Sequence, residues 1–438
     1  MSGSYWEPKY EAMPRERLRE LQTYRLKNTL VSVYENVPFY KKRLDDCGVN
    51  PYKFTNLDDV VMIPFTTKDD LRDNYPFGLF ARPMNDIVRI HSSSGTTGNP
   101  TVVSYTKNDI TMWGNLIARG LYSTGVRSSD IIQNSYGYGL FTGGLGLHYG
   151  AELLGATVIP VSGGLTERQL KIMQDYSSTV LCCTPSYALF IAEVGSEQGI
   201  DFKNLPLKIG IFGAEPWTEE MRLEIEARLF IDAIDIYGLS EIIGPGVSCE
   251  CIEKKGLHIA EDHFYTEIID PATGKNLSVG NQGEIVFTSL TKEAMPLLRY
   301  RSRDLSELND STCICGRTHA RMKKPMGRTD DMLIIRGVNV FPSQIEEVLM
   351  KIKEIEPHYL IVVGRENYLD TIELWVEVSE DVFAERINDL EKFESAIESK
   401  LYSAVGISID VKLKEPKTIK RSEGKAKRVV DKRKGEVI

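Results

Sequence analysis

The stretch from position 91 to position 100 reads His-Ser-Ser-Ser-Gly-Thr-Thr-Gly-Asn-Pro, and it directly follows a short apolar run at 87–90. A strand that enters a loop so rich in Ser, Thr and Gly offers closely approachable backbone N–H groups and several hydroxyl donors, which suit a polyphosphate. A Walker P-loop is excluded because the Gly-Lys-Ser/Thr ending is missing. A polar surface loop is the alternative. We therefore predict a phosphate-binding loop at the end of a strand.

Composition bounds the class of protein. The chain has 438 residues, 42% hydrophobic and 26% charged, which suits a globular enzyme of two or three domains. The formal net charge of -9 argues against nucleic acid as a partner, since phosphate contacts need a basic surface. The first 20 residues lack the apolar core of a signal peptide, and no stretch approaches a membrane span. We expect a cytoplasmic protein without a membrane partner, and its 7 cysteines are not expected to form a disulfide framework.

Short apolar runs alternate with helical stretches in the first half of the chain. The runs are 131–134, 156–160, 180–185 and 208–213, and 15–34 and 106–122 show helical spacing. This alternation predicts an α/β fold, in which parallel strands are joined by crossover helices. Loops at the strand ends of such a sheet are where ligands bind.

Further motifs follow the phosphate loop along the chain. They are Tyr237-Gly238-Leu239-Ser240-Glu241, Arg299-Tyr300-Arg301-Ser302-Arg303-Asp304, Gly327-Arg328-Thr329-Asp330-Asp331 and Gly424-Lys425. In this order and spacing they resemble the adenylate-forming enzymes, the acyl-CoA synthetase superfamily, from about Tyr5 to the C-terminus. The short length and the stretches at 141–144 and 336–342 are most similar to its phenylacetate-CoA ligase branch.

The resemblance implies a fold and a domain organisation. A large N-terminal ATP- and acyl-binding domain, 1–328, would hold mostly parallel sheets flanked by helices, and a small mobile α+β lid, 329–438, would carry the catalytic lysine Lys425. Asp330 would be the hinge between them. A nucleic-acid-binding or merely solvated tail is the alternative for the basic stretch 417–434, but Lys425 matches the adenylation lysine of the family. A mobile cation there would bridge a carboxylate and the α-phosphate.

The same resemblance assigns a nucleotide site. Tyr237 would lie against the adenine, Asp304 would accept hydrogen bonds from the ribose, and Glu241 would hold Mg²⁺, which prefers oxygen ligands. Ser240 replaces the usual Thr, and Arg303 replaces the usual Gly before Asp304. The full set of predicted nucleotide contacts is Ser93, Ser94, Gly95, Thr96, Thr97, Gly98, Ala214, Glu215, Pro216, Tyr237, Gly238, Ser240, Asp304 and Arg328.

Aromatic residues alternate with glycines at 135–146. Rings give flat apolar walls and glycines allow close backbone approach, which suits an aromatic acid. A glycine-rich helix start with aromatic residues in the core is the alternative. The family places its acyl pocket at this segment, so we predict that Tyr136, Phe141 and Gly213 line it.

The cysteine pairs suggest a metal site that the family does not require. A four-residue hairpin turn at 253–256 would pair Ile252 with Leu257 and place Cys251 opposite His258. Cys313 and Cys315 would complete the tetrahedral set of structural zinc. Free buried thiols are the alternative.

Together these motifs predict an enzyme that ligates an aryl acid, foremost phenylacetate, to coenzyme A with ATP and Mg²⁺, through an acyl-adenylate, releasing AMP and pyrophosphate. An adenylating enzyme that stops at the adenylate or loads a carrier-protein thiol, and a non-catalytic nucleotide-binding protein, are the alternatives. The oligomeric state is left open between a monomer and a homodimer.

Overall fold

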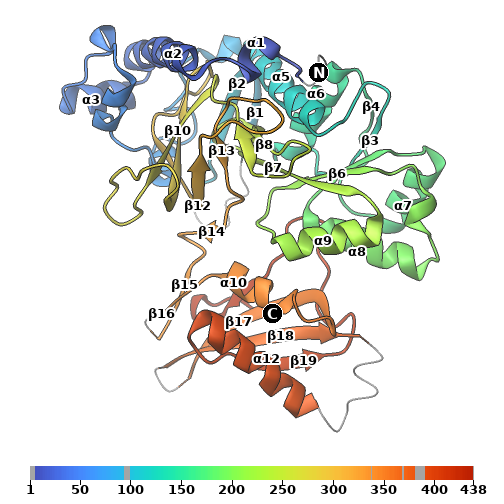
Figure 1. Ribbon diagram of the computed structural model, residues 1–438. Coiled ribbons are helices and arrows are strands. Elements are labelled where there is room, and N and C mark those ends of the chain that lie inside the picture. Colours follow the sequence, from blue (N-terminus) through green and yellow to red (C-terminus); the bar gives the residue numbers. More distant parts are fainter. Residues whose placement is uncertain (1–4, 93–98, 337, 367–368, 380–389, 438) are drawn as a thin grey trace.

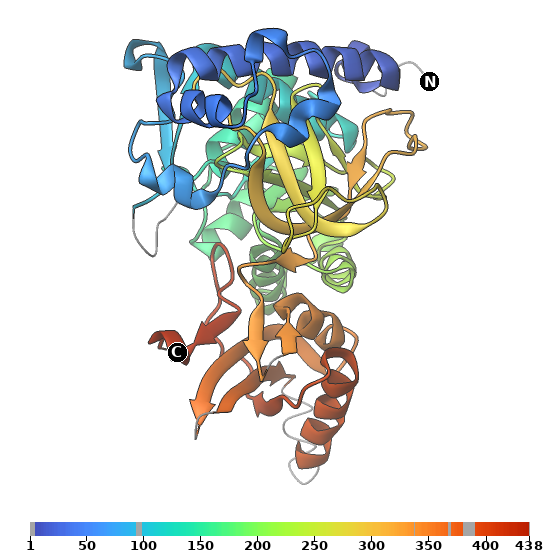
Figure 2. The same ribbon diagram turned by 90° about the vertical axis from the view of Figure 1, so that its left-hand side faces the viewer.

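The structure is a computed structural model that describes residues 5–92, 99–336, 338–366, 369–379 and 390–437. A larger N-terminal part lies above a smaller C-terminal part in both ribbon views (Figure 1, Figure 2). The predicted phosphate contacts at 93–98 lie outside the described residues. Within the described residues, no helix is long and apolar enough to cross a bilayer.

One large sheet organises the N-terminal part. Its strand order is β10-β11-β12-β13-β9-β8-β7-β6-β5-β3-β4, with β14 beside β12. Neighbours from β7 to β4 are parallel, as predicted, whereas the pairs on the other side of β7 are antiparallel. The bounds are β3 Ile131–Asn134, β4 Thr157–Ile159, β5 Val180–Cys183, β6 Ile209–Gly213, β7 Asp232–Leu239, β8 Gly244–Cys249, β9 Leu257–Ile259, β10 Phe264–Ile269, β11 Gln282–Ser289, β12 Tyr300–Asn309, β13 Arg321–Met322 and β14 Gly327–Arg328.

Helices cover both faces of the parallel part (Figure 1), so its strands are buried throughout. Side chains of β5 alternate between two cores: Cys182 packs with residues of α5 and α6, while Leu181 and Cys183 pack with those of α7, α8 and α9. Both cysteines are 0% exposed, which confirms that they act as small apolar residues. The helices are α5 Lys107–Ser123, α6 Gly143–Leu154, α7 Thr166–Asp175, α8 Pro185–Glu197 and α9 Glu219–Leu229.

The N-terminal segment packs helices over the top of the sheet (Figure 2). α2 spans Arg15–Asn36, close to the predicted helix, and α1 Pro8–Glu11, α3 Pro38–Asp46 and α4 Lys68–Asp73 accompany it. Strands β1 Ile87–Ser92 and β2 Val102–Thr106 form a separate antiparallel pair in which His91 faces Val103. This pair brackets the predicted phosphate loop and fixes both of its ends.

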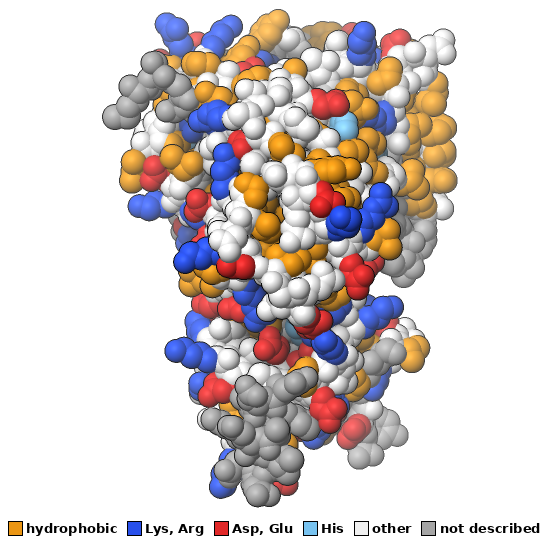
Figure 3. Space-filling model, turned by 90° about the vertical axis from the view of Figure 1, so that its right-hand side faces the viewer, with side chains coloured by type: hydrophobic (Ala, Val, Ile, Leu, Met, Phe, Trp, Pro, Cys, Tyr) orange, Lys and Arg blue, Asp and Glu red, His pale blue; other side chains and the backbone are white. Residues whose placement is uncertain are grey.

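The C-terminal part has its own core, whose residues come from Leu333 to Val429. Its sheet has the order β19-β18-β17-β20, and β15 and β16 form a hairpin. The elements are β15 Leu333–Ile335, β16 Val338–Val340, α10 Pro342–Leu349, β17 Ile355–Glu366, β18 Leu369–Val378, α12 Leu390–Val405, β19 Asp410–Lys414 and β20 Val429–Asp431. The predicted α+β character is confirmed. On the face in Figure 3, basic side chains stand among acidic and apolar ones.

One predicted pairing is wrong. β8 ends at Cys249, and the register places Cys249, not Cys251, opposite His258. The chain between β8 and β9 is longer than a four-residue turn, and Cys251 lies in it with its carbonyl accepting from the Lys254 N–H at 3.0 Å. A shift by two residues keeps side chains on the same face, so the alternation of residue types could not distinguish the two registers.

Candidate active site

A cavity of about 970 Å³ opens where β3, β5, β6 and β7 end, at the carboxyl edge of the parallel sheet. This is the edge at which open α/β sheets bind ligands. β12 and the C-terminal loop 423–426 close it from the other sides. The predicted residues that line this one cavity are Tyr136, Phe141, Gly213, Ala214, Glu215, Pro216, Tyr237, Gly238, Ser240, Glu241, Asp304, Arg328, Asp330 and Lys425.

The end of β6 approaches β7 too closely for a side chain. A Cβ on Gly213 would lie 2.1 Å from the Ile236 carbonyl oxygen, so glycine is required there. The next residue, Ala214, has φ 71°, a conformation that side-chain-bearing residues seldom adopt. Such strain persists where the surrounding structure enforces it, and it turns the chain sharply at the cavity wall.

The motif at the end of β7 brings oxygen donors into the cavity. Ser240 Oγ lies 3.0 Å from Thr142 Oγ1, at the start of α6. Glu241 is 7% exposed, and its Oε1 lies 3.9 Å from Lys68 Nζ. The set of a hydroxyl and a carboxylate fits a hard divalent cation such as Mg²⁺.

A chain of polar contacts crosses the cavity floor. The Tyr237 hydroxyl donates to Asp304 Oδ2 at 2.5 Å, and Arg328 Nη1 donates to Asp304 Oδ1 at 2.9 Å. Arg328 also donates from Nε to Asp330 Oδ1 at 2.8 Å. Burial raises the pKa of Asp304 to about 6, although Arg328 and Tyr237 oppose the shift. Arg328 thus joins the predicted ribose acid to the predicted hinge.

Arg303 stands at the position where the family resemblance implies a glycine. Its φ is 69°, in the left-handed region where glycine has no steric penalty. The backbone is held there by Glu284, which accepts from the Arg303 N–H at 3.2 Å and pairs with Arg301 at 2.6 Å.

The predicted acyl wall contains two kinds of aromatic residue. Tyr136 is 5% exposed and belongs to the main core, whereas Phe141 is 36% exposed and faces the cavity. A Cβ on Gly143 would lie 2.3 Å from the Phe141 ring, so that glycine makes room for the ring. The segment therefore combines the two interpretations, since the Tyr136 ring both packs in the core and lines the cavity, while the Phe141 ring lines the cavity.

Lys425 enters the cavity from the C-terminal loop. Its Nζ lies 5.7 Å from the centroid of the Phe141 ring. Burial lowers the pKa of Lys425, and the carboxylates of Glu215, Glu241 and Asp304 oppose that shift. The Lys425 cation therefore shares one cavity with Phe141 of the predicted acid pocket and with the carboxylates of Glu241 and Asp304.

Lys68 and Asp235 are among the charged residues that line the cavity without having been predicted as site residues. Lys68 is the first residue of α4, where Thr67 and Asp70 form a capping box, and its Nζ lies 3.9 Å from Glu241 Oε1. Asp235 lies buried in the middle of β7, and burial raises the pKa of its carboxyl to about 7. The only available signal for Asp235 was a carboxylate within an apolar strand.

The cysteine cluster lies outside the cavity and has the predicted members. One ligand atom from each of Cys251, His258, Cys313 and Cys315 lies within 4.8 Å of the other three. Cys251 Sγ is 3.9 Å from Cys313 Sγ, and Cys315 Sγ is 3.5 Å from His258 Nε2. Three cysteine sulfurs and one imidazole in a compact group form a donor set that is typical of structural zinc. Cys251 reaches this group from the turn.

Sequence comparisons match both parts of the chain. The family described as AMP-binding enzyme matches residues 13–291, and the AMP-binding enzyme C-terminal domain matches residues 337–433. A phenylacetate-coenzyme A ligase from Thermus thermophilus is 53% identical over 98% of this chain and 100% of its own length.

Structural comparisons distinguish two conformations. A 2-hydroxyisobutyryl-CoA ligase in the postadenylation state, in complex with R3-HIB-AMP, has a TM-score of 0.93 at 29% identity, covering 99% of this chain and 94% of its own. The same ligase in the thioesterification state, in complex with 2-HIB-AMP and CoA, has a TM-score of only 0.72 at 30% identity, covering 98% and 92%. The arrangement of the two parts is therefore more similar to the postadenylation state of that ligase than to its thioesterification state.

Proposed function

Because the chain belongs to the phenylacetate-coenzyme A ligase family of AMP-binding enzymes, and is therefore an ATP-dependent, AMP-forming acid–CoA ligase that works through an acyl-adenylate, we propose that its acid is phenylacetate. The observation that carries this proposal is the exposed face of Phe141 inside the cavity, 5.7 Å from Lys425 Nζ. A flat ring would pack on Phe141 while its carboxylate faces the lysine.

The first half-reaction joins the acid to the α-phosphorus of ATP and expels pyrophosphate. In our proposal Lys425 draws the carboxylate and the α-phosphate together and stabilises the charge that develops between them. Asp304 and Tyr237 orient the nucleoside, while Ser240 contacts the phosphate. Positioning and charge neutralisation supply the acceleration, as in other phosphoryl chemistry.

The second half-reaction passes the acyl group to the thiol of CoA. We propose that the lid rotates about Asp330, which withdraws Lys425 and admits the thiol. The boundary proposed between residues 328 and 329 suits this motion, because β14 still pairs with β12 while the separate C-terminal core begins at Leu333.

Two metals belong to the proposal. Glu241 would hold Mg²⁺, whose charge would neutralise the polyphosphate, and Lys68 stands close enough to share that task. Zinc would bind Cys251, His258, Cys313 and Cys315 and serve stability alone. Thiolate ligands persist under reducing conditions, and ATP and CoA are cytoplasmic substrates, so we place the enzyme in the cytoplasm. The oligomeric state stays open between a monomer and a homodimer.

A release assay tests the proposal. Purified enzyme is given ATP, Mg²⁺ and one of a series of acids, phenylacetate, benzoate and a medium-chain fatty acid among them, with and without CoA. We expect pyrophosphate release to be fastest with phenylacetate, and a thioester to form only with CoA. Preference for another acid would contradict the proposed substrate, and transfer to a carrier-protein thiol but not to CoA would favour a carrier-loading enzyme.

A further inference from the structure

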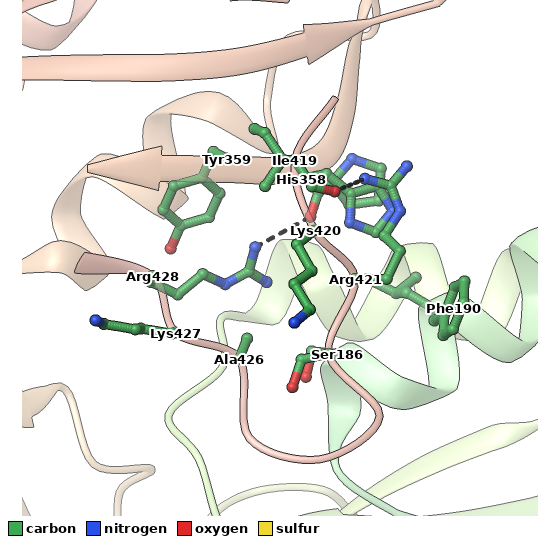
Figure 4. A pocket seen from close by; sticks show the side chains of 13 residues that line it. Ser186, Phe190, His358, Tyr359, Ile419, Lys420, Arg421, Ala426, Lys427 and Arg428 are labelled. Carbon is green, nitrogen blue, oxygen red and sulfur yellow. Dashed lines mark hydrogen bonds between the residues drawn. The ribbon is translucent and has the colours of Figure 1, made fainter. Parts of the chain in front are cut away.

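The loop that carries Lys425 rests on the start of α8. Thr184 Oγ1 and Ser186 Oγ donate to the Gly424 carbonyl at 2.9 and 3.3 Å. Figure 4 shows this loop passing in front of the start of α8, with Ala426 close to Ser186. The residue immediately before the lysine is therefore hydrogen-bonded to the N-terminal part.

The residue after the lysine is held as well. The Ala426 N–H donates to Glu215 Oε2 at 2.8 Å, while Oε1 of the same carboxylate accepts from the Ser186 N–H at 2.8 Å. Although the family resemblance places Glu215 beside the adenine, its side chain is committed to the lid. Burial raises the pKa of Glu215, and the hydrogen bonds from Ser186 and Ala426 limit the rise.

A bidentate ion pair anchors the same segment further along α8. Arg421 donates from Nε to Glu193 Oε2 at 2.9 Å and from Nη2 to Oε1 at 2.7 Å. The side chains are 11% and 19% exposed, so water screens the pair little. Burial opposes ionisation, but hydrogen bonds from His358 and Arg421 lower the pKa of Glu193 to about 2.

Gly163 supplies a steric part of the same contact. A Cβ on Gly163 would lie 2.9 Å from the Glu423 carbonyl oxygen, so the lid backbone approaches as closely as a glycine permits. The lid segment 421–426 thus contacts the N-terminal part in three ways. It makes hydrogen bonds, it forms the ion pair with Glu193, and its backbone packs closely against Gly163.

We propose that Gly163, Thr184, Ser186, Glu193 and Glu215 form a docking platform that positions Lys425 for adenylation and sets how readily the lid leaves that conformation. The proposal rests on the proposed two-step function. Glu193 does not line the cavity and acts through Arg421, so it is a positioning residue. Weakening the platform should slow adenylate formation, which needs Lys425 in the cavity. It should not slow thioester formation, for which the lid is proposed to rotate away.

Glu193→Gln is the informative variant, because it keeps the shape and removes the charge. Arg421 is a poorer choice, since it also holds the fully buried Glu377 at 2.8 Å. In single turnover, we expect pyrophosphate release without CoA to slow about 10-fold. Thioester formation from a supplied acyl-adenylate and CoA should not slow. Gly163→Ala, which pushes the lid backbone away without changing charge, should give the same pattern.

Glu197→Gln is the matched control. Glu197 lies on the same helix and pairs with Lys417 of the lid at 2.7 Å, but both side chains are exposed, 46% and 64%. It should change either half-reaction less than about twofold, since exposed pairs contribute little. Equal slowing of both half-reactions by Glu193→Gln, or an unchanged first half-reaction, would refute the platform. If the wild-type enzyme forms the adenylate but no thioester, CoA as the acceptor is refuted and not the platform. The platform is then tested by the rate of pyrophosphate release alone.

Discussion

Phe141 is the residue at which substrate recognition and packing are most easily separated. Its ring faces the cavity and is 36% exposed, whereas Tyr136 belongs to the main core. Removing the ring in Phe141→Ala takes away apolar contact worth roughly 1 to 3 kcal/mol. We expect kcat/KM for phenylacetate to fall about 10- to 100-fold, while KM for ATP stays nearly constant.

The ranking of acids provides the check on Phe141. Since the cavity grows, a medium-chain fatty acid should lose less than phenylacetate, and a melting curve should show little change. A less stable variant with an unaltered ranking of acids would make Phe141 a packing residue.

Asp304 should make ATP binding depend on pH. Its pKa is raised to about 6, so the carboxylate is present above that pH and is lost as pH falls through it. The acid form is a poorer acceptor for ribose hydroxyls, and KM for ATP should rise roughly 10-fold for each unit below the pKa. Steady-state kinetics from pH 7.5 to 5 measure this. Asp304→Asn should raise KM at pH 7.5 and flatten the profile; an unchanged slope in the variant would assign the titration to another group.

For helices and strands, the sequence predicts those features that depend on neighbouring residues, such as helix starts and buried strands. The helix after β2 begins where Thr106 and Asp109 form a capping box, and buried β5 and β6 are continuous apolar runs. The parallel direction of these strands follows from the alternation of strands and helices along the chain. The order of the antiparallel strands depends on long-range pairing, for which the residues carry no local signal.

The hairpin at the cysteines shows this limit at one position. Cys249 and Cys251 have the same parity, and either could face His258, so loop length alone decides between them. The four predicted ligand side chains nevertheless lie together, because a turn can carry Cys251 back to the group. In the structure Cys249 instead packs against Gly120 in the main core.

Zinc content distinguishes the two cysteines. Purified protein should carry about one equivalent of zinc, and Cys313→Ser should lower both metal content and melting temperature, because the site exists only in the folded chain. Cys249→Ala is the control: it should cost stability but keep the metal. Elemental analysis of a zinc-free wild type, stable after chelation, would return these residues to free buried thiols.

For the whole molecule, the sequence does not predict the position of the lid relative to the N-terminal part. The motif around Lys425 identifies the lysine. No sequence pattern indicates which of the two proposed lid positions the structure adopts. That depends on contacts between distant segments, such as Arg421 with Glu193 and Ala426 with Glu215. Such contacts follow from the fold and cannot be inferred from periodicity or spacing.

Lys425→Ala tests the two-position lid directly. The variant should lose adenylate formation by at least about 100-fold, since a preorganised charge at the displacement is removed. Thioester formation from a supplied acyl-adenylate should remain within about threefold of wild type, because the lysine has then left the site. Rapid-quench measurement of each half-reaction gives both numbers. A comparable loss in both would mean that Lys425 serves a single conformation.

Arg328 has a consequence for the order in which products depart. Its guanidinium holds both Asp304, at 2.9 Å, and Asp330, at 2.8 Å, on the short strand that joins the lid to the sheet. The proposed ribose contact and the proposed pivot of the lid therefore share one side chain. We expect AMP to dissociate last, after the lid has returned, so that AMP competes with ATP alone in product-inhibition kinetics while the thioester does not.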